Sequence, residues 1–286
     1  MTTKGASALA ALGSMLLATA VAAQCRPPAS SHEARLLAFY EAPIVFSMAA
    51  APERLAFGAV RIGGEAIPVP SPNAELQHPE YCYENTTNNT KLASIFGRPR
   101  LTIGLPASVA LEASYLPNIS VGDAQATVAS VALSRTQSMP FTGERVTLLL
   151  RAHMTTGRVR GPITCPRANL QSTDAAAPCY GTEPSRDTFR PSSFGFEGAL
   201  GIGNDGGRIA AYAGGGVSSL RPRFQAGFTD NFGNVDRTTV SVNLLRAAAF
   251  AGATARLSHA IAISAQLYAV PSDVTTVRVG AQYIVR

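Results

Sequence analysis

The sequence contains no tryptophan and only two lysines, and its charged residues amount to 15% of the chain. Soluble domains carry roughly 25% charged residues, so a surface fully exposed to water is not indicated. The 22 arginines are scattered singly among apolar residues. A nucleic-acid-binding protein would cluster them on one face, and we therefore expect no nucleic-acid partner.

Long apolar runs and familiar catalytic motifs are also missing. Beyond residue 23 no run of about 18 apolar residues occurs, which excludes a transmembrane helix there. The sequence has no Gly-x-Ser-x-Gly elbow, His-Glu-x-x-His pair, phosphate-binding loop, dinucleotide fingerprint or Cys-x-x-Cys spacing. We therefore predict that the protein is not an enzyme and holds neither a cofactor nor a metal.

The first 23 residues have the features of a cleavable secretory signal. Lys4 precedes an apolar run over residues 6–20, and the small residues Val-Ala-Ala follow at residues 21–23. We expect cleavage after Ala23 and export of the mature chain.

Most of the remaining sequence alternates apolar and polar residues, which is typical of strands with one apolar face. The pattern is clear in residues 107–117, 144–156, 261–269 and 276–286. Six weaker segments follow the same pattern: residues 55–62, 98–105, 125–135, 192–203, 208–231 and 235–257. Together they predict an all-β fold, a closed antiparallel up-and-down transmembrane β-barrel of about ten strands.

Strand length and loop length support a barrel over a β-sandwich. Several segments run for about 9–13 residues, whereas sandwich strands average about 5–6. With both chain ends on one side, an even strand count places the long links 63–97 and 160–190 together on the other side. A longer turn is expected at residues 137–143. In residues 235–257 the apolar parity runs into Arg246, which suggests a bulge or hidden turn and leaves eight or twelve strands open.

A helical period is present only near the N-terminus of the mature chain. Ser30 and Glu33 have capping-box spacing, and three apolar residues share one face before Pro43 ends the pattern. These residues are Leu36, Leu37 and Tyr40. The predicted organisation is therefore a signal at 1–23, an N-terminal helical segment at 24–52 in or under the barrel mouth, and a barrel at 53–286.

Charged residues on the face away from lipid are the candidate functional residues. They either pair with one another or line a water-filled lumen. The candidates are Arg100, Glu112, Arg145, Arg151, His153, Glu197, Arg208 and Arg278. At about ten strands the interior is hardly wider than its side chains require, which favours an ion-pair network over a channel. The excess of arginine would favour anions if a channel exists.

The last strand carries a pattern with a known counterpart. Gly280, Tyr283 and Val285 stand in the order glycine, two residues, hydrophobic, one residue, hydrophobic. This resembles the C-terminal signal of Gram-negative outer-membrane β-barrels. The resemblance implies an outer-membrane location and recognition by the barrel-assembly machinery. Many members end on an aromatic residue, whereas this chain ends on Arg286, and tyrosines would have to supply the aromatic girdle: Tyr115, Tyr212, Tyr268 and Tyr283.

Four cysteines in an exported chain favour disulfides, with three connectivities available. Cys165 and Cys179 lie in one long loop and are the expected pair. The remaining pair, Cys25 with Cys82, would join a periplasmic end to an outside loop. That bridge requires the N-terminal segment to thread the lumen and act as a plug.

These features predict an outer-membrane barrel acting as a narrow pore or as a surface-exposed structural or binding protein. Its expected partners are outer-membrane lipid, the assembly machinery and a small solute. Two alternatives remain. One is a barrel hydrolase with a rim active site, which needs a serine or carboxylate within reach of His153. The other is a soluble secreted β-sandwich that binds a ligand.

Overall fold

The computed structural model describes residues 24–82, 95–121, 123–141, 144–204, 208–271 and 273–285. The predicted signal peptide at residues 1–23 lies outside these ranges.

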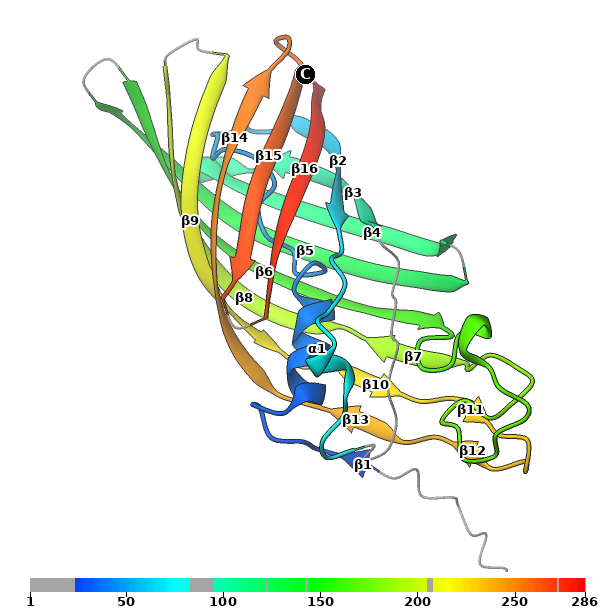
Figure 1. Cartoon of the computed structure of the whole chain (residues 1–286). Helices are drawn as coiled ribbons and strands as arrows, with labels where there is room; N and C mark the ends of the chain where they lie inside the picture. The colour runs from blue at the N-terminus through cyan, green and yellow to red at the C-terminus, as the bar shows by residue number, and fades with distance from the viewer. Residues whose placement is uncertain are drawn as a thin grey trace, which may run out of the picture.

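Within the described residues, ten strands form a closed antiparallel barrel (Figure 1). They are β2 (Val60–Pro68), β3 (Ile95–Gly104), β4 (Val109–Val121), β5 (Ala124–Phe141), β6 (Glu144–Gly161), β8 (Ser192–Asn204), β9 (Ile209–Leu220), β14 (Leu244–Arg256), β15 (Ile261–Val270) and β16 (Val274–Val285). Each strand pairs with the next in this order, and β16 pairs back onto β2. The predicted all-β up-and-down barrel is confirmed, and the β-sandwich is excluded because the sheet closes on itself.

Short strands extend the wall at one end. β7 (Asp187–Arg190) leads into β8, β10 (Arg223–Gln225) continues β9, and β13 (Thr239–Ser241) leads into β14. Pro191 and Pro222 stand at the first two breaks, because proline has no N–H for the ladder. The remaining short elements are β1 (Gln24–Cys25), β11 (Phe228–Thr229), β12 (Val235–Asp236), η1 (Glu75–Gln77), η2 (Pro106–Ser108) and η3 (Arg167–Asn169).

The two rims of the barrel differ in the length of their connections. At the short-turn rim, residues 105–108 and 257–260 join neighbouring strands, and β5 and β16 end there. At the long-loop rim β2 ends at Pro68 beside Ile95, and β6 ends at Gly161, so the links after these two strands both begin there. The loop at residues 226–238 lies at the same rim. The two predicted long links therefore share one rim. The longer turn expected at residues 137–143 is wrong, because β5 and β6 are each 18 residues long and run almost to their hairpin tip.

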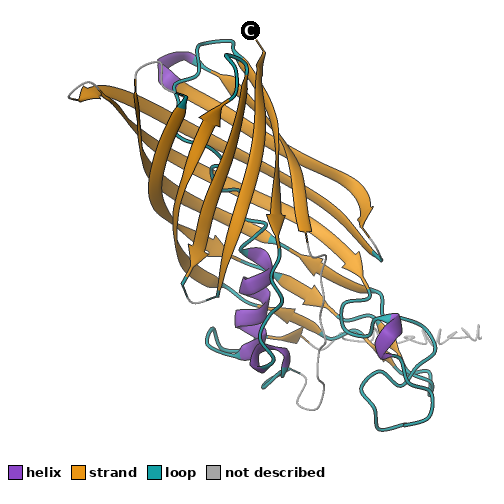
Figure 2. Cartoon of the chain, turned by 45° about the horizontal axis from the view of Figure 1, so that its top comes forward, coloured by secondary structure: helices purple, strands orange, loops and turns teal. Residues whose placement is uncertain are grey.

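Helix α1 (His32–Glu41) lies within the long-loop end of the barrel (Figure 2). Its N-cap is Ser31, whose side chain accepts a hydrogen bond from the N–H of Ala34. The predicted capping box is therefore wrong: Ser30 is not the cap. Glu33 instead accepts hydrogen bonds from the backbone at residues 80–82. No helix in the described part of the chain is long and apolar enough to span a membrane.

Side chains alternate between an apolar outer face and a filled interior. Val240, Val242 and Leu244 are buried against α1, and Arg246 keeps the same inward parity. A bulge or hidden turn is expected because Arg246 interrupts the apolar pattern, but Arg246 lies on the same inward face as Leu244. The ladder is interrupted after β13, and inside the wall apolar contacts give way to polar ones. Tyr212 and Tyr268 are also buried inside, so neither belongs to an outer aromatic girdle.

Candidate functional site

Residues 42–56, here called the luminal segment, fill the middle of the barrel. They run from the end of α1 to the short-turn rim, where β2 begins. The side chain of Phe46 is fully buried. Four arginines from β3, β6 and β16 contact the backbone of this segment, which places it inside the wall rather than beside it.

Arginine side chains of the wall satisfy the carbonyl groups of the luminal segment. Arg98 donates to the carbonyl oxygens of Ile44 and Val45 at 2.7 and 2.9 Å. Arg278 donates to those of Val45 and Ala42 at 3.2 and 3.1 Å. The next two arginines continue the series: Arg151 donates to Phe46 and Arg100 to Ser47. The segment has no sheet partner, and of these carbonyls the one of Val45 also accepts from the N–H of Ser47, so the arginines supply most of the donors that the buried carbonyls need.

Three glutamates of the interior lie among the four arginines. Glu65 pairs with Arg98 and lies 3.2 Å from Arg100. Glu112 links the next two arginines, at 2.6 Å from Arg100 and 2.8 Å from Arg151. The third carboxylate, Glu197, lies 2.7 Å from Arg151. Because each carboxylate contacts at least one guanidinium, the low-dielectric interior holds paired charges.

The luminal segment also contacts one carboxylate of the wall, and its Phe46 ring contacts the arginines. Ser47 donates its hydroxyl to Glu197 at 2.7 Å, and the Met48 N–H donates to the same carboxylate at 2.8 Å. The ring of Phe46 lies under three guanidinium groups, with centroid distances of 4.4 to 4.8 Å. Cation–π contacts of this kind are strongest where water is excluded. One aromatic side chain therefore organises most of the arginine cluster.

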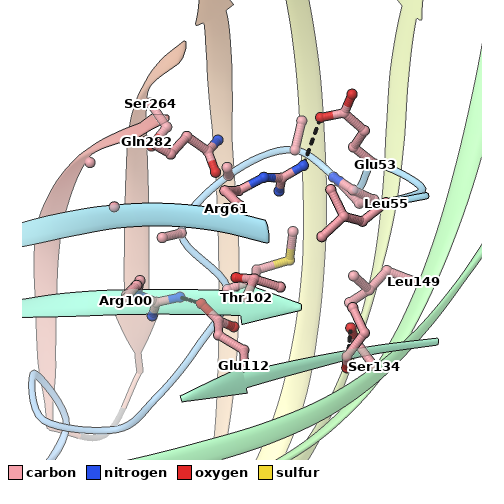
Figure 3. A pocket seen from close by; sticks show the side chains of 18 of the residues that line it. Glu53, Leu55, Arg61, Arg100, Thr102, Glu112, Ser134, Leu149, Ser264 and Gln282 are labelled. Carbon is pink, nitrogen blue, oxygen red and sulfur yellow. Dashed lines mark hydrogen bonds and ion pairs between the residues drawn. The ribbon is translucent and has the colours of Figure 1, made fainter. Parts of the chain in front are cut away.

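Two small cavities remain near the short-turn rim, on either side of the luminal segment. Figure 3 shows one of about 80 Å³, in which Glu53 of the segment pairs with Arg61 at 2.9 Å. Glu53 also pairs with Arg256, which lines the second cavity of about 150 Å³. Arg145 and Arg208 line that second cavity. Among the described residues, these cavities lie between the arginine cluster and this rim, and Arg100, Glu112 and Arg151 line the first of them.

The structure places the candidate residues in two groups. Six lie around the luminal segment, five of them buried and Glu112 partly buried: Arg100, Glu112, Arg151, His153, Glu197 and Arg278. Arg145 and Arg208 lie at the cavity near the short-turn rim instead. Sequence reasoning missed Arg98, although it shares the parity of Arg100 two residues on. It also missed Glu65 and Phe46, because Gly63 and Gly64 interrupt the strand pattern and Phe46 follows the predicted helix.

His153, the candidate base of the hydrolase alternative, lies in a row across three strands. It pairs in register with Gly195, which pairs with Ser218. A methyl group at Gly195 would meet the Ser218 hydroxyl at 2.4 Å and the His153 ring at 2.8 Å, so the glycine makes room for both. His153 and Ser218 are each buried, with exposed fractions of 3% and 7%. A substrate would have to displace the interior to reach them.

The two buried glutamates of α1 have opposite electrostatics. Burial alone would raise the pKa of Glu33, but three backbone N–H groups at residues 80–82 hold this pKa below its ordinary value. Burial raises the pKa of Glu41 well above its ordinary value, and its one backbone donor, the N–H of Ser192, offsets this only in part. Glu33 thus fastens the helix to the loop after β2, whereas the ionised form of Glu41 is destabilising.

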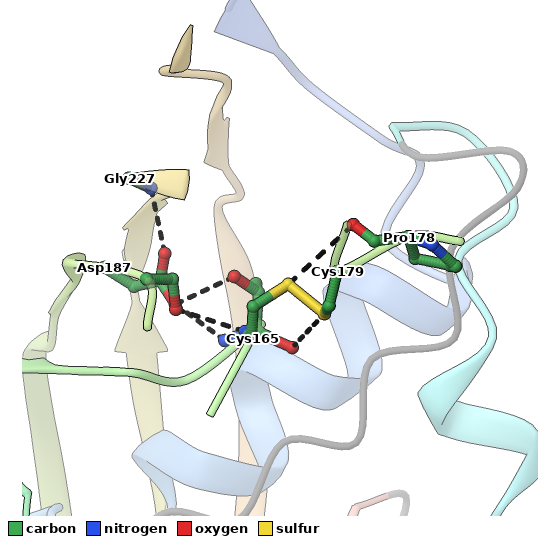
Figure 4. The surroundings of a disulfide bond; sticks show 7 residues. Cys165, Pro178, Cys179, Asp187 and Gly227 are labelled. Carbon is green, nitrogen blue, oxygen red and sulfur yellow. Dashed lines mark hydrogen bonds between the residues drawn. A yellow bond between two sulfur atoms is a disulfide. The ribbon is translucent and has the colours of Figure 1, made fainter. Parts of the chain in front are cut away.

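Both disulfides are formed, and both lie at the long-loop rim. Cys25 pairs with Cys82, closing a separation of 57 residues, and Cys165 pairs with Cys179. Beside the second bridge, Asp187 is fully buried (Figure 4). It accepts hydrogen bonds from residues 164, 185 and 227, which ties both long loops to β7. The first bridge fastens β1 to the loop after β2.

The residues of the C-terminal pattern lie on β16. Tyr283 and Val285 are exposed on the outer face, and Gly280 faces inward beside Ser264. One edge of β16 pairs with β15, and the other edge pairs with β2 over residues 279–285, which closes the barrel.

No protein-family model matches this chain, and no curated protein matches it. Among solved structures, it is similar to the outer membrane phospholipase A from Escherichia coli, with 11% identity over 87% of this chain and 96% of that chain and a TM-score of 0.24. It is also similar to a mutant of the Rh. blastica porin, with 9% identity over 80% and 98% and a TM-score of 0.19. Similarity at this level bears on neither activity nor substrate.

Proposed function

We propose that this chain is an integral β-barrel of a bacterial outer membrane whose lumen is closed by its own N-terminal residues. The outer face supports membrane insertion, because every barrel strand exposes at least one large apolar side chain on it. A contiguous apolar face of this extent is unfavourable in water and is covered by lipid in membrane barrels. The alternation of side chains, the length of the strands and the closure of the sheet all fit an outer face covered by lipid.

The short-turn rim faces the periplasm in this proposal. Outer-membrane barrels have short periplasmic turns and longer extracellular loops. The β16 pattern of Gly280, Tyr283 and Val285 is then the signal for the assembly machinery. The disulfide-braced loop at residues 162–186 and the loop at 226–238 beside it would face the medium, and disulfides persist in such oxidising surroundings.

The arginine cluster around Phe46 is the observation that carries the closed state. Four guanidinium groups, three carboxylates and the luminal segment fill the cross-section together. Passage of a solute would require this segment to leave. We therefore favour a closed barrel that presents its braced loops as a surface structure over a permanently open pore.

Membrane insertion is tested by heat-modifiable migration. The protein is expressed with its own N-terminus, outer membranes are isolated, and gel mobility is compared before and after boiling. A mobility shift in the outer-membrane fraction is expected from a detergent-resistant barrel. Recovery as a soluble periplasmic protein with no shift would contradict the proposal.

Closure is tested by single-channel conductance in planar bilayers. The full chain should give no steady current, whereas a variant that lacks residues 24–52 should conduct. With the luminal segment gone, four arginines face three glutamates, so the open lumen should prefer anions. Arg158→Gln, a change on the outer face of β6, is the matched control and should stay closed. Equal conductance of the full chain and the deletion variant would rule out the plug.

A further inference from the structure

Arg135 faces away from the barrel interior. Arg135 is exposed on β5, between the outward residues Leu133 and Gln137. Its guanidinium group makes no ion pair or hydrogen bond with another described residue. The outward charges of the neighbouring β6 lie at its ends, with Glu144 at one and Arg158 and Arg160 at the other. An unpaired cation on a lipid-facing wall is unfavourable unless an anion or water meets it.

Arg135 borders a hollow of about 620 Å³ in the outer face. Four apolar side chains surround this hollow: Leu133, Leu150, Phe196 and Val217. Gly198 and Gly215 form part of its floor, so the wall lacks side chains where they would fill it. The hollow thus combines an apolar bed with a single cation at its edge.

Arg135 lies on the part of the wall nearer the short-turn rim, six residues before β5 ends at Phe141. It pairs in register with Val109, the first residue of β4, which follows η2 at the short-turn rim. The hollow extends from there across β6, β8 and β9 toward the middle of the wall. A ligand that fits has a charged end toward this rim and an apolar end farther from it.

We propose that this hollow binds an anionic phospholipid of the leaflet at the short-turn rim, with its phosphate on Arg135 and an acyl chain over the glycine floor. This inference rests on the proposed membrane location. A guanidinium group binds phosphate through two parallel hydrogen bonds, and a lipid is the phosphate source that also brings an apolar chain.

Charge complementarity favours a lipid over a second copy of the barrel. The outward residues of β8, β9 and β14 are apolar or small and include no carboxylate. A copy that docked through this face would therefore leave Arg135 without an anion. A phospholipid supplies the anion and the apolar contact together.

The test uses detergent-purified barrel that has passed the heat-shift assay, studied by native mass spectrometry. Phosphatidylglycerol and phosphatidylcholine with identical acyl chains are added in turn. The wild type should retain phosphatidylglycerol preferentially, and Arg135→Gln should weaken its binding about five-fold. Arg158→Gln, which removes an exposed arginine at the other end of the wall, should leave the preference unchanged.

A second variant fills the hollow itself. A Cβ at residue 198 would lie 3.6 Å from the nearest atom, a methyl group of Leu150, so Gly198→Leu can extend outward without strain. It should reduce the binding of both lipids. Equal lipid binding by Arg135→Gln and Arg158→Gln would overturn the proposal. Detection of a dimer in place of lipid adducts would also overturn it, if Gly198→Leu dissociates that dimer. A heat shift without lipid preference would leave the membrane barrel standing and remove only this inference.

Discussion

The two halves of the filled lumen satisfy the backbone polar groups of the chain inside them in different ways. Near the long-loop rim the interior is apolar, because α1 packs against valine and leucine side chains such as Val240 and Leu244. Around residues 42–48 the wall carries arginines and glutamates instead. A helix satisfies its own backbone groups, so its wall can be apolar. A chain without a sheet partner leaves its carbonyls free, and the wall must then supply donors.

This comparison explains the surplus of arginine over glutamate in the lumen. Each of the four arginines donates to at least one backbone carbonyl of the luminal segment as well as lying among carboxylates. Carbonyl oxygens carry partial negative charge and need donors but no counter-charge. The closed state therefore explains the surplus of arginine without a permeating anion.

The largest effect should come from breaking the charged half. Arg151→Met leaves Glu112 and Glu197 buried without this partner and removes the donor to Phe46. We expect a loss of about 4 kcal/mol in the free energy of unfolding, measured by denaturant titration of heat-modifiable mobility. Arg158→Met, on the exposed face of the same strand, is the control. Similar losses in both variants would mean that the cluster does not stabilise the fold.

The apolar half should respond to volume rather than charge. Leu244→Ala opens a cavity against α1 and should cost about 3 kcal/mol in the same assay. Its neighbour Leu245 points outward and is 70% exposed, so Leu245→Ala should cost clearly less. If Leu245→Ala were the more damaging change, the inward packing of residue 244 would be wrong.

A smaller effect is expected where the helix is fastened to the long loop. Glu33→Gln loses a carboxylate that accepts three backbone hydrogen bonds and should cost about 1–2 kcal/mol at neutral pH. Because its pKa is lowered in the folded state, this stability is present above the ordinary value of 4.5 and is lost as pH falls below it. The difference between wild type and Glu33→Gln should therefore shrink in acid. A constant difference would contradict the assignment.

The smallest effect should be found at Glu41, and with the opposite sign. Its pKa is raised in the folded state, so the native protein binds this proton more tightly than the unfolded chain does. The wild type therefore loses stability as pH rises above 4.5, toward the folded pKa. Glu41→Gln imitates the protonated form and should match the wild type in acid and equal or exceed it at neutral pH. Destabilisation at neutral pH would show that the ionised carboxylate is favoured.

The barrel was largely readable from the sequence because strand parity is a local property. The clear alternation in residues 144–156 and 261–269 assigns inward and outward faces without knowledge of the partners. The same parity predicted that Arg100, Arg151 and Arg278 point inward. It was misleading only where the interior itself changes character, as at Arg246, because the pattern assumes one kind of filling.

Sequence by itself determined the all-β pattern, the inward set of charges and the local Cys165–Cys179 pair, since each follows from spacing along the chain. Tertiary structure alone decided what those charges contact. The luminal segment has no strand period, and its interactions come from backbone carbonyls that look alike in every sequence. Which arginine meets which carbonyl, and that Phe46 lies among them, depends on residues more than 50 positions apart brought together by closure of the barrel.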